Sequence, residues 1–384
     1  MNHSFKTGTG PVGMIGSGLL LPNEPRIYQP QIQAGLTRHY LLPFLEELHA
    51  CLLAVRVQLD PQLARLQPRK LGKPYPLGQC LEIAQAVEQG LRVASEATLS
   101  HAAAIGLRAL RAFQQAGGAF RQVWGDLRGQ YFQNAFQLGT LYVDVANDTV
   151  TPTKPKVEIM PFDEAGFVPI RDFDHFCQIA VSYWGGKVFP NHVLPQLAPH
   201  CPLIYLADDG GIRFYDVSKY MLALTCSQGF APSVDVLKKK PMPAEVFEQV
   251  CKALPDDAGP LPKSAKVGRE LALRQCRDQR AKRWHHLPAV QARVVLETMR
   301  LNMHLARYHL ETIKSNSSKE QAMSIIRIDN KEYELDSLPA EARTQLQSIQ
   351  YVNQELARLR AHTAAMETAR NAYMNALKAL LPAA

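Results

Sequence analysis

A cysteine at the start of a predicted helix is the residue of this sequence with the clearest chemical potential. In KPYPLGQCLEIAQAVEQGL, residues 73–91, Cys80 follows a proline-rich turn and opens an amphipathic segment. A helix N-terminus stabilises a thiolate, because free backbone N–H groups and the positive end of the helix dipole face the sulfur. Cys80 is therefore a candidate nucleophile. The alternative interpretation is a buried small residue at a helix start.

A nucleophilic cysteine works with a base within hydrogen-bond reach, commonly a histidine that an Asp or Asn orients. The strands expected after Gly118 are the place to look for that base. Metal chemistry is not expected, because no histidine pair among these candidates has the i, i+4 spacing that brings two imidazoles to one ion. His285 and His286 are adjacent and should point apart on a helix, while His304 and His309 are five residues apart. We therefore expect neither a metal nor a bound cofactor.

The helices expected around this cysteine follow from the spacing of apolar residues. Within residues 36–66, apolar side chains recur at intervals of three and four, which predicts one helix with Pro61 and Pro68 at its end. Shorter helices are expected at 81–93 and 101–115. Helices thus precede the strands along the chain.

Strand composition begins after the third of these helices. Four segments have it, with Gly129 and Gly139 in the turns between them: AFRQVWGDL, QYFQNAFQL, TLYVDVAN and PKVEIMPF. A helical pattern returns in FDHFCQIAVSYWG, and PLIYLADDGGIRFYDV predicts a hairpin that turns at residues 209–211. Helices followed by an antiparallel sheet indicate an α+β protein.

The C-terminal part of the chain is dominated by helical patterns. A helical region is expected at 269–324, interrupted at Pro288, and SIIRIDNKEYEL predicts a small hairpin after it. Beyond the hairpin, apolar residues from Leu346 to Leu380 repeat at three and four, as in a long amphipathic helix. Such a helix cannot cover its apolar side alone. We therefore expect a coiled-coil contact with a protein partner or self-association.

The resulting division has five parts. They are an extended arm at 1–35, an α+β core at 36–230, a linker around one short helix at 231–268, a helical region at 269–324, and a hairpin with a long helix at 325–384.

Length, charge and cysteine content narrow the class of protein. At 384 residues the chain is long enough for two or three compact units, and its formal charge of +8 favours anionic partners in general. The seven cysteines show no C-x-x-C spacing, which indicates reduced thiols in a cytoplasm. The sequence contains no apolar run of about 18 residues, so no membrane span is expected.

Three motifs follow one another between Tyr75 and Asp148: LGQC, GLRALRAFQQAGGAFRQVWG and NAFQLGTLYVDVAND. Their order resembles the core of the transglutaminase-like cysteine enzymes of the papain-like class, in which Gly-Gln-Cys opens the core helix and a His-Ala-Trp strand precedes Trp-x-x-x-Asp. The resemblance implies a papain-like core with Cys80 as nucleophile and Asp144 as the acid that orients the base. Asn134 occupies the position of the catalytic histidine, which departs from the family pattern.

The tail of the chain has a second resemblance. Residues 325–381 are similar to a small uncharacterised bacterial domain that has no assigned activity. This similarity therefore implies no chemistry for the tail.

Strand pairing offers a separate view of the candidate site. A three-residue loop at 138–140 would place Asn134 opposite Asp144, and a two-residue loop at 138–139 would place Gln133 there. In both cases an amide meets the carboxylate. An amide cannot accept and return a proton near neutral pH, so it cannot serve as the general base.

Two main hypotheses of function remain open. The first is a cytoplasmic bacterial binding or assembly protein, built on a catalytically degenerate core and acting through its C-terminal helix. The second is a cysteine-dependent acyl transferase or hydrolase in which Cys80 attacks an amide or thioester carbonyl. It would need a histidine from elsewhere, with candidates at His175, His192 and His200. A third hypothesis is nucleic-acid binding through the basic segment 269–286, for which a solvated helix face is the simpler interpretation.

Overall fold

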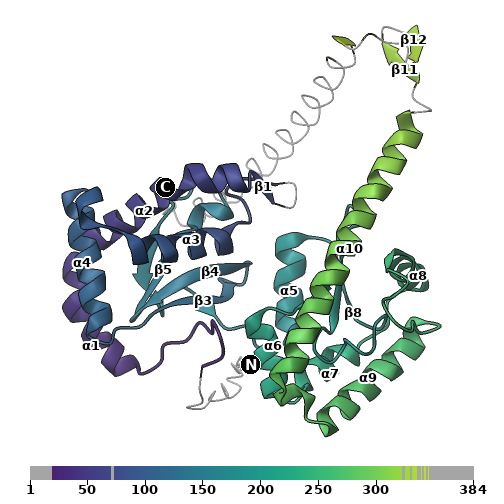
Figure 1. The fold of residues 1–384 in the computed structure, drawn as a ribbon, viewed down its shortest axis with the longest axis horizontal. Coiled ribbons are helices and arrows are strands. Elements are labelled where there is room, and N and C mark those ends of the chain that lie inside the picture. Colours follow the sequence, from purple (N-terminus) through teal and green to yellow (C-terminus); the bar gives the residue numbers. More distant parts are fainter. Residues whose placement is uncertain are drawn as a thin grey trace, which may run out of the picture. The chain divides into compact units, whose positions relative to one another are not determined.

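The structure of the chain is a computed structural model. It describes residues 20–70, 73–321, 325–328 and 331–334, with the single residues 339, 341, 342 and 345, and it describes side chains as far as residue 313. The chain forms two compact units, residues 1–309 and 310–384. The fold class is α+β as expected, with helices before and after antiparallel sheets (Figure 1). The five-part division of the chain stays a prediction.

The first helices differ from the expected ones at their boundaries. They are α1 (Pro30–Tyr40), η1 (Leu42–Phe44), α2 (Leu45–Leu66), α3 (Cys80–Val93), η2 (Glu96–Thr98) and α4 (His101–Gln115). The single helix expected at 36–66 was wrong, because the chain turns at residues 41–44. Pro61 was expected at the end of that helix but lies inside α2. α2 buries Leu48, Leu52 and Val55 in the core, and this packing outweighs the local cost of the proline.

The main sheet has five antiparallel strands in the order β6-β5-β4-β3-β7. The strands are β3 (Phe120–Leu127), β4 (Tyr131–Leu138), β5 (Leu141–Asp144), β6 (Glu158–Pro161) and β7 (Phe167–Val168). Leu138 pairs with Leu141, so the loop between β4 and β5 is Gly139-Thr140. Both loops considered from the sequence were therefore wrong in register. Gly139 has a φ of +59°, and a Cβ there would lie 2.1 Å from the Thr37 hydroxyl, which favours glycine at this turn.

The two faces of this sheet are buried against different layers. On one face, Phe136 and Val143 belong to a core cluster with the apolar side chains of α2, α3 and α4. On the other face, Tyr142 packs with Phe162 and Phe167 from the segment that leads into β7. Because successive side chains of a strand alternate between faces, this burial determines which polar residues point toward α3.

The rest of the first unit surrounds a three-stranded antiparallel sheet in the order β10-β9-β8. Its elements are β8 (Lys187–Pro190), β9 (Leu203–Leu206), β10 (Ile212–Tyr215), α5 (Phe173–Trp184), α6 (Lys219–Ser227), α7 (Ala231–Leu237), α8 (Ala244–Ala253), α9 (Ala265–Ala281), η4 (Trp284–His286) and α10 (Pro288–Gln321). The hairpin expected between residues 203 and 215 is confirmed, since Leu206 pairs with Ile212. The expected helix in FDHFCQIAVSYWG is α5.

Two predictions made from the sequence for this region differ from the structure. The segment 231–268 was expected to hold one short helix, but it contains both α7 and α8, whose apolar side chains join buried clusters. His285 and His286 were expected to point apart, which is wrong. They lie in the short η4 turn, and their ring centroids are 4.0 Å apart. A 3₁₀ turn holds neighbouring side chains differently from a long α-helix.

The second unit contains the hairpin expected from SIIRIDNKEYEL. β11 (Ile325–Ile328) pairs with β12 (Lys331–Glu334) in antiparallel fashion, with Ile325 opposite Glu334. The expected turn at 329–330 and the long helix expected from Leu346 lie outside the described residues. Among the helices that are described, none combines the length and apolar character needed to cross a membrane.

Candidate functional site

The turn before α3 holds Cys80 in place through three hydrogen bonds, two to α2 and its C-terminal end and one to the segment after β5. The Gly78 N–H donates to the Thr149 carbonyl at 2.9 Å, and the Gln79 side chain donates to the Gln67 carbonyl at the end of α2 at 2.9 Å. The Tyr75 hydroxyl donates to Asp60 Oδ1 on α2 at 2.5 Å. Cys80 then begins α3, as the sequence predicted.

The Cys80 sulfur contacts an amide and not an imidazole. Asn134 Nδ2 donates to Cys80 Sγ at 3.4 Å. Gln122 Nε2 in turn donates to Asn134 Oδ1 at 3.2 Å, across the β3–β4 pair. The three side chains therefore form a hydrogen-bonded row of thiol, amide and amide on the face of the sheet that α3 covers.

Burial determines the protonation state of this thiol. Cys80 is partly buried, and the loss of water around its sulfur raises the pKa of the thiol above its ordinary value; this effect outweighs the opposing influence of the Asn134 amide and the Lys70 ammonium. A thiol with a raised pKa is protonated near neutral pH and is a poor nucleophile. The helix N-terminus is present, but it does not overcome the burial.

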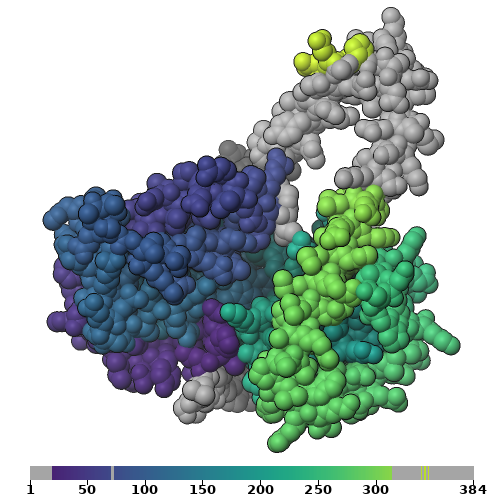
Figure 2. Space-filling view, in the orientation of Figure 1, coloured from purple at the N-terminus to yellow at the C-terminus, as the bar shows by residue number. Residues whose placement is uncertain are grey.

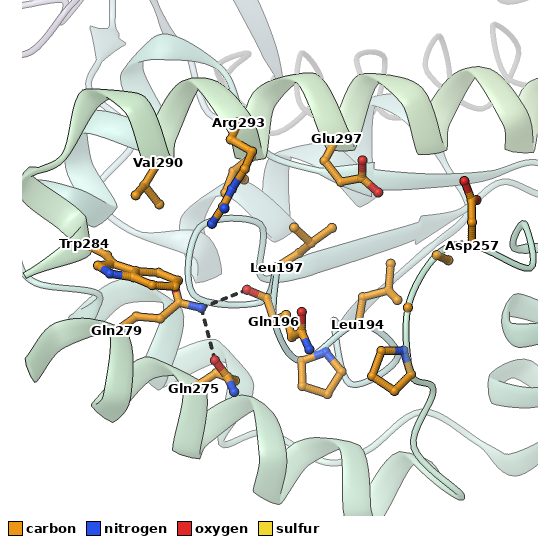
Figure 3. Close-up of a pocket in the computed structure, with 15 residues that line it drawn as sticks. Leu194, Gln196, Leu197, Asp257, Gln275, Gln279, Trp284, Val290, Arg293 and Glu297 are labelled. Atoms are coloured by element: carbon orange, nitrogen blue, oxygen red, sulfur yellow. Dashed lines mark hydrogen bonds between the residues drawn. The ribbon is translucent and has the colours of Figure 1, made fainter. Parts of the chain in front are cut away.

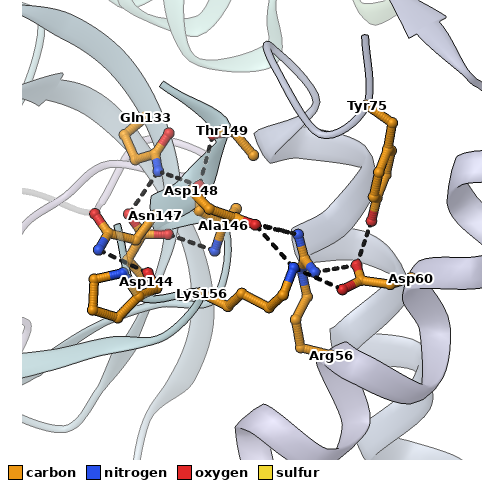
Figure 4. Close-up of polar contacts among 11 residues, drawn as sticks. Arg56, Asp60, Tyr75, Gln133, Asp144, Ala146, Asn147, Asp148, Thr149 and Lys156 are labelled. Atoms are coloured by element: carbon orange, nitrogen blue, oxygen red, sulfur yellow. Dashed lines mark hydrogen bonds and ion pairs between the residues drawn. The ribbon is translucent and has the colours of Figure 1, made fainter. Parts of the chain in front are cut away.

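Asp144 lies on the opposite face of the sheet from this row. Its carboxylate accepts hydrogen bonds from Gln133 Nε2 at 2.6 Å and the Ala146 N–H at 2.7 Å (Figure 4). It also accepts from the Tyr142 hydroxyl at 3.1 Å. The structure thus brings Cys80 and Asn134 together but pairs Asp144 with Gln133. An amide does meet this carboxylate, as both sequence alternatives required, although through a register that neither of them proposed.

The three histidines considered as alternative bases are engaged elsewhere. His175 Nε2 lies 2.9 Å from Asp126 Oδ2, and its Nδ1 accepts from the Arg171 N–H at 3.3 Å. His192 Nε2 lies 2.9 Å from the Leu237 carbonyl. His200 is fully buried against Phe230, and this burial lowers the pKa of the imidazole to about 4. Within the residues whose side chains are described, no histidine makes a hydrogen bond to Cys80.

A buried ion-pair network, which was not predicted from the sequence, holds α2 against the turn before Cys80. Arg56 on α2 is fully buried, and its guanidinium pairs with Asp148 at 3.1 Å and with Asp60 one helical turn away (Figure 4). Lys156 pairs with the same two carboxylates, at 2.9 Å from Asp60 and 3.1 Å from Asp148. Asp60 also accepts from Tyr75, so the network ties α2 to the turn before Cys80 and to the short helix η3 (Asn147–Thr149) after β5.

A sequence signal for this network did exist. Arg56 interrupts the apolar face of α2, and a charged residue at such a position needs a buried partner of opposite charge. The sequence does not identify this partner, because Asp148 lies 92 residues further along the chain.

Comparisons with known proteins add no relative to this geometry. No protein-family model, no curated protein and no solved structure matches the chain. Within the described residues, no group of three or more His, Cys, Asp or Glu side chains could hold a metal ion. The function therefore has to be argued from the site itself.

The buried carboxyl of Asp144 predicts a measurable pH dependence of stability. Burial raises its pKa to about 6, above the usual value near 3.9, so the folded chain binds a proton that the unfolded chain releases between these values. Folding is therefore favoured as the pH falls from 7 to 5, by about 1 kcal/mol for this one group. Urea unfolding at both pH values should show a smaller gain for Asp144→Asn than for the unchanged protein.

Asp216 makes that comparison necessary. Burial also raises its pKa to about 6, and it contributes with the same sign in both proteins. Only the difference between the two gains reports on Asp144. Equal gains in the two proteins would show that Asp144 is ionised throughout this range.

Proposed function

We propose that this protein is a cytoplasmic bacterial binding or assembly protein, built on a transglutaminase-like core that has lost its catalytic base. The observation that supports the proposal best is the contact of Cys80 Sγ with the Asn134 amide. In the family that the sequence resembles, a histidine would stand at this position. An amide neither takes the thiol proton nor returns it to a leaving group, so it supports no acyl transfer.

The surroundings of the thiol support a structural role for it. The Asn134 amide is held by Gln122, and the pKa of Cys80 is raised by burial. The alternative, a cysteine-dependent acyl transferase or hydrolase, would need an imidazole at this sulfur. Without a base, this arrangement of side chains can still hold α3 and the sheet in register for binding. The absence of any disulfide among the seven cysteines agrees with a cytoplasmic location.

Cys80 is expected to react slowly with iodoacetamide at pH 6 in the folded, full-length protein. Its thiol is protonated at that pH because burial raises its pKa, and only the thiolate attacks the reagent. Peptide mass spectrometry gives the labelling rate of each cysteine, and Cys251, which like Cys80 is partly buried, serves as the internal reference. Cys80 should label no faster than Cys251. Selective labelling of Cys80 at pH 6 would reveal an activated thiolate and favour the acyl-transferase alternative.

The assembly role is supported by one exposed side of α10. Large apolar side chains there in the first unit are Leu296, Met299 and Met303, each at least 54 % exposed. Their spacing of three and four corresponds to successive a, d and a positions of a heptad, which form the contact surface of a coiled coil. The part of α10 in the first unit lies at its surface (Figure 2). We propose that a helix of a second copy of this chain covers this side.

The double substitution Leu296→Glu and Met303→Glu is expected to abolish this assembly. Glutamates at a and d positions would have to leave water to enter a helix–helix contact, and this cost opposes association. Light scattering after size-exclusion chromatography measures the mass of the full-length protein. The unchanged protein should exceed the mass of one chain and the variant should not. The control is the double substitution Gln114→Glu and Gln115→Glu on the exposed end of α4, which adds the same two negative charges elsewhere. A single-chain mass for the unchanged protein would contradict self-association through α10.

A further inference from the structure

A cavity far from Cys80 in sequence lies between two loops and the helices α9 and α10 (Figure 3). Its volume is about 540 Å³, which is within the range of small-molecule sites in proteins. The loops are residues 194–197 and 257–260, and the helices contribute Gln275, Gln279 and Arg293 among other side chains. All of its residues belong to the first unit, and none takes part in the Cys80 site.

Gln279 lines this cavity and carries a buried hydrogen-bond acceptor without a partner. Its side chain is 3 % exposed, and its Nε2 donates to the Gln196 carbonyl at 2.9 Å and to Gln275 Oε1 at 3.3 Å (Figure 3). These two bonds orient the amide and leave Oε1 buried with no hydrogen-bond partner. An unsatisfied buried acceptor is costly. A ligand with an N–H or O–H group at this point would remove that cost.

Arg293 provides a cationic group at the same cavity. Its guanidinium lies over the Trp284 ring, 5.8 Å from the ring centroid, and the side chain points from α10 into the open space (Figure 3). Among the described side chains, no carboxylate or other hydrogen-bond acceptor pairs with it. A guanidinium in this state can bind two oxygens of a carboxylate or phosphate at once.

The two acids of the cavity do not neutralise Arg293. Asp257 and Glu297 both pair with Arg300, at 2.8 Å and 2.7 Å. The remaining wall is apolar at Leu194, Leu197 and Val294 and polar at Gln196 and Gln275. The cavity thus offers a free cation, a free buried acceptor and an apolar surface.

We propose that this cavity binds a small organic oxyanion, meaning a carboxylate or a phosphate ester with an apolar or planar body. The oxyanion pairs with Arg293, an N–H or O–H group of the ligand donates to Gln279 Oε1, and the body packs against the apolar wall. Trp284 holds the guanidinium in position from one side.

Isothermal titration of the full-length protein tests this proposal and separates the two oxyanions. The probes are N-acetylleucine as a carboxylate and adenosine monophosphate as a phosphate ester, with N-acetylleucinamide and adenosine as their neutral counterparts, all at one ionic strength. We expect at least one anionic probe to bind with a Kd below about 1 mM. The Kd of its neutral counterpart should be at least about tenfold higher. The anionic probe that binds shows whether the site prefers a carboxylate or a phosphate ester.

Two substitutions and a control locate the binding. Arg293→Gln should weaken binding of the anionic probe by about tenfold or more, and Gln279→Met should weaken binding of the same probe by removing the acceptor. Arg307→Gln also removes a cation from an exposed position of α10, but it lies outside the cavity and should leave binding unchanged. Circular dichroism confirms that each variant is folded.

Three results would overturn the proposal. They are no binding of either anionic probe at about 10 mM, equal binding of the anionic and neutral probes, and equal losses in Arg293→Gln and Arg307→Gln. The last result would mean that the anion responds to the overall positive charge of the chain and not to this cavity.

Discussion

Replacement of Arg56 by methionine is expected to lower the free energy of unfolding by about 3–5 kcal/mol, which is the largest effect predicted for a single substitution in this protein. Arg56 is fully buried between two carboxylates, Asp60 and Asp148. Without the guanidinium, the 3 %-exposed Asp148 keeps only Lys156 as a cationic partner, and two like charges face each other across a space with little water. The methionine fills much of the volume but pairs with neither acid.

Chemical unfolding at pH 7, followed by circular dichroism, measures this loss. The matched control is Arg92→Met, because Arg92 also belongs to a helix and pairs with a carboxylate, Glu88, one turn away. That pair is largely exposed, so its loss should change stability by less than about 0.5 kcal/mol. Similar small losses for both variants would show that Asp148 finds another partner or water when Arg56 is removed.

The substitution Asn134→His is expected to convert Cys80 into a reactive thiol. The Asn134 amide lies 3.4 Å from Sγ, so an imidazole in its place can form an ion pair with the thiolate. Gln122 already bonds the far side of residue 134 and can orient the new ring through its amide. The nearby positive charge should lower the pKa of Cys80 and raise its labelling rate by iodoacetamide at pH 6 at least about tenfold.

Asn134→Ala is the matched control for that experiment. It removes the same hydrogen bond and opens space at the sulfur without providing a base. Faster labelling in the histidine variant than in the alanine variant would therefore be due to the imidazole and not to access. Equal rates in the two variants would contradict the assignment of residue 134 to the position of the base. Cys80→Ser, made in the Asn134→His protein, identifies the labelled peptide.

The Arg56 network and the row of Cys80, Asn134 and Gln122 together fix the surroundings of the Cys80 sulfur. The Arg56 network holds the turn before Cys80 against α2, and the sheet brings Asn134 up to the sulfur from the other side. Such a rigid arrangement agrees with the proposed structural role of Cys80. The same rigidity is the reason why one substitution at 134 is expected to make the thiol reactive without other changes.

Much of the local structure was predictable from the sequence. Apolar spacing of three and four predicted α3 and α4 almost to the residue, and β-branched and aromatic runs between glycine turns predicted β3 to β6. These signals are local, because a helix or strand must match the period of its own side chains to bury one face. The position of Cys80 at a helix N-terminus followed from the same reasoning.

The tertiary structure alone decided which polar residues meet. The register of β4 on β5 depends on the loop at residues 139–140, whereas the sequence suggested a loop at 138–140 or 138–139. A shift of one residue moves a side chain to the other face of the sheet. Asp144 consequently pairs with Gln133 on one face, while Asn134 contacts Cys80 on the other. The pairing of Arg56 with Asp148 and the cavity at Gln279 likewise join residues far apart in sequence. Sequence periodicity determines which side of an element is apolar, but the partner across a core is chosen by packing, which involves the whole chain at once.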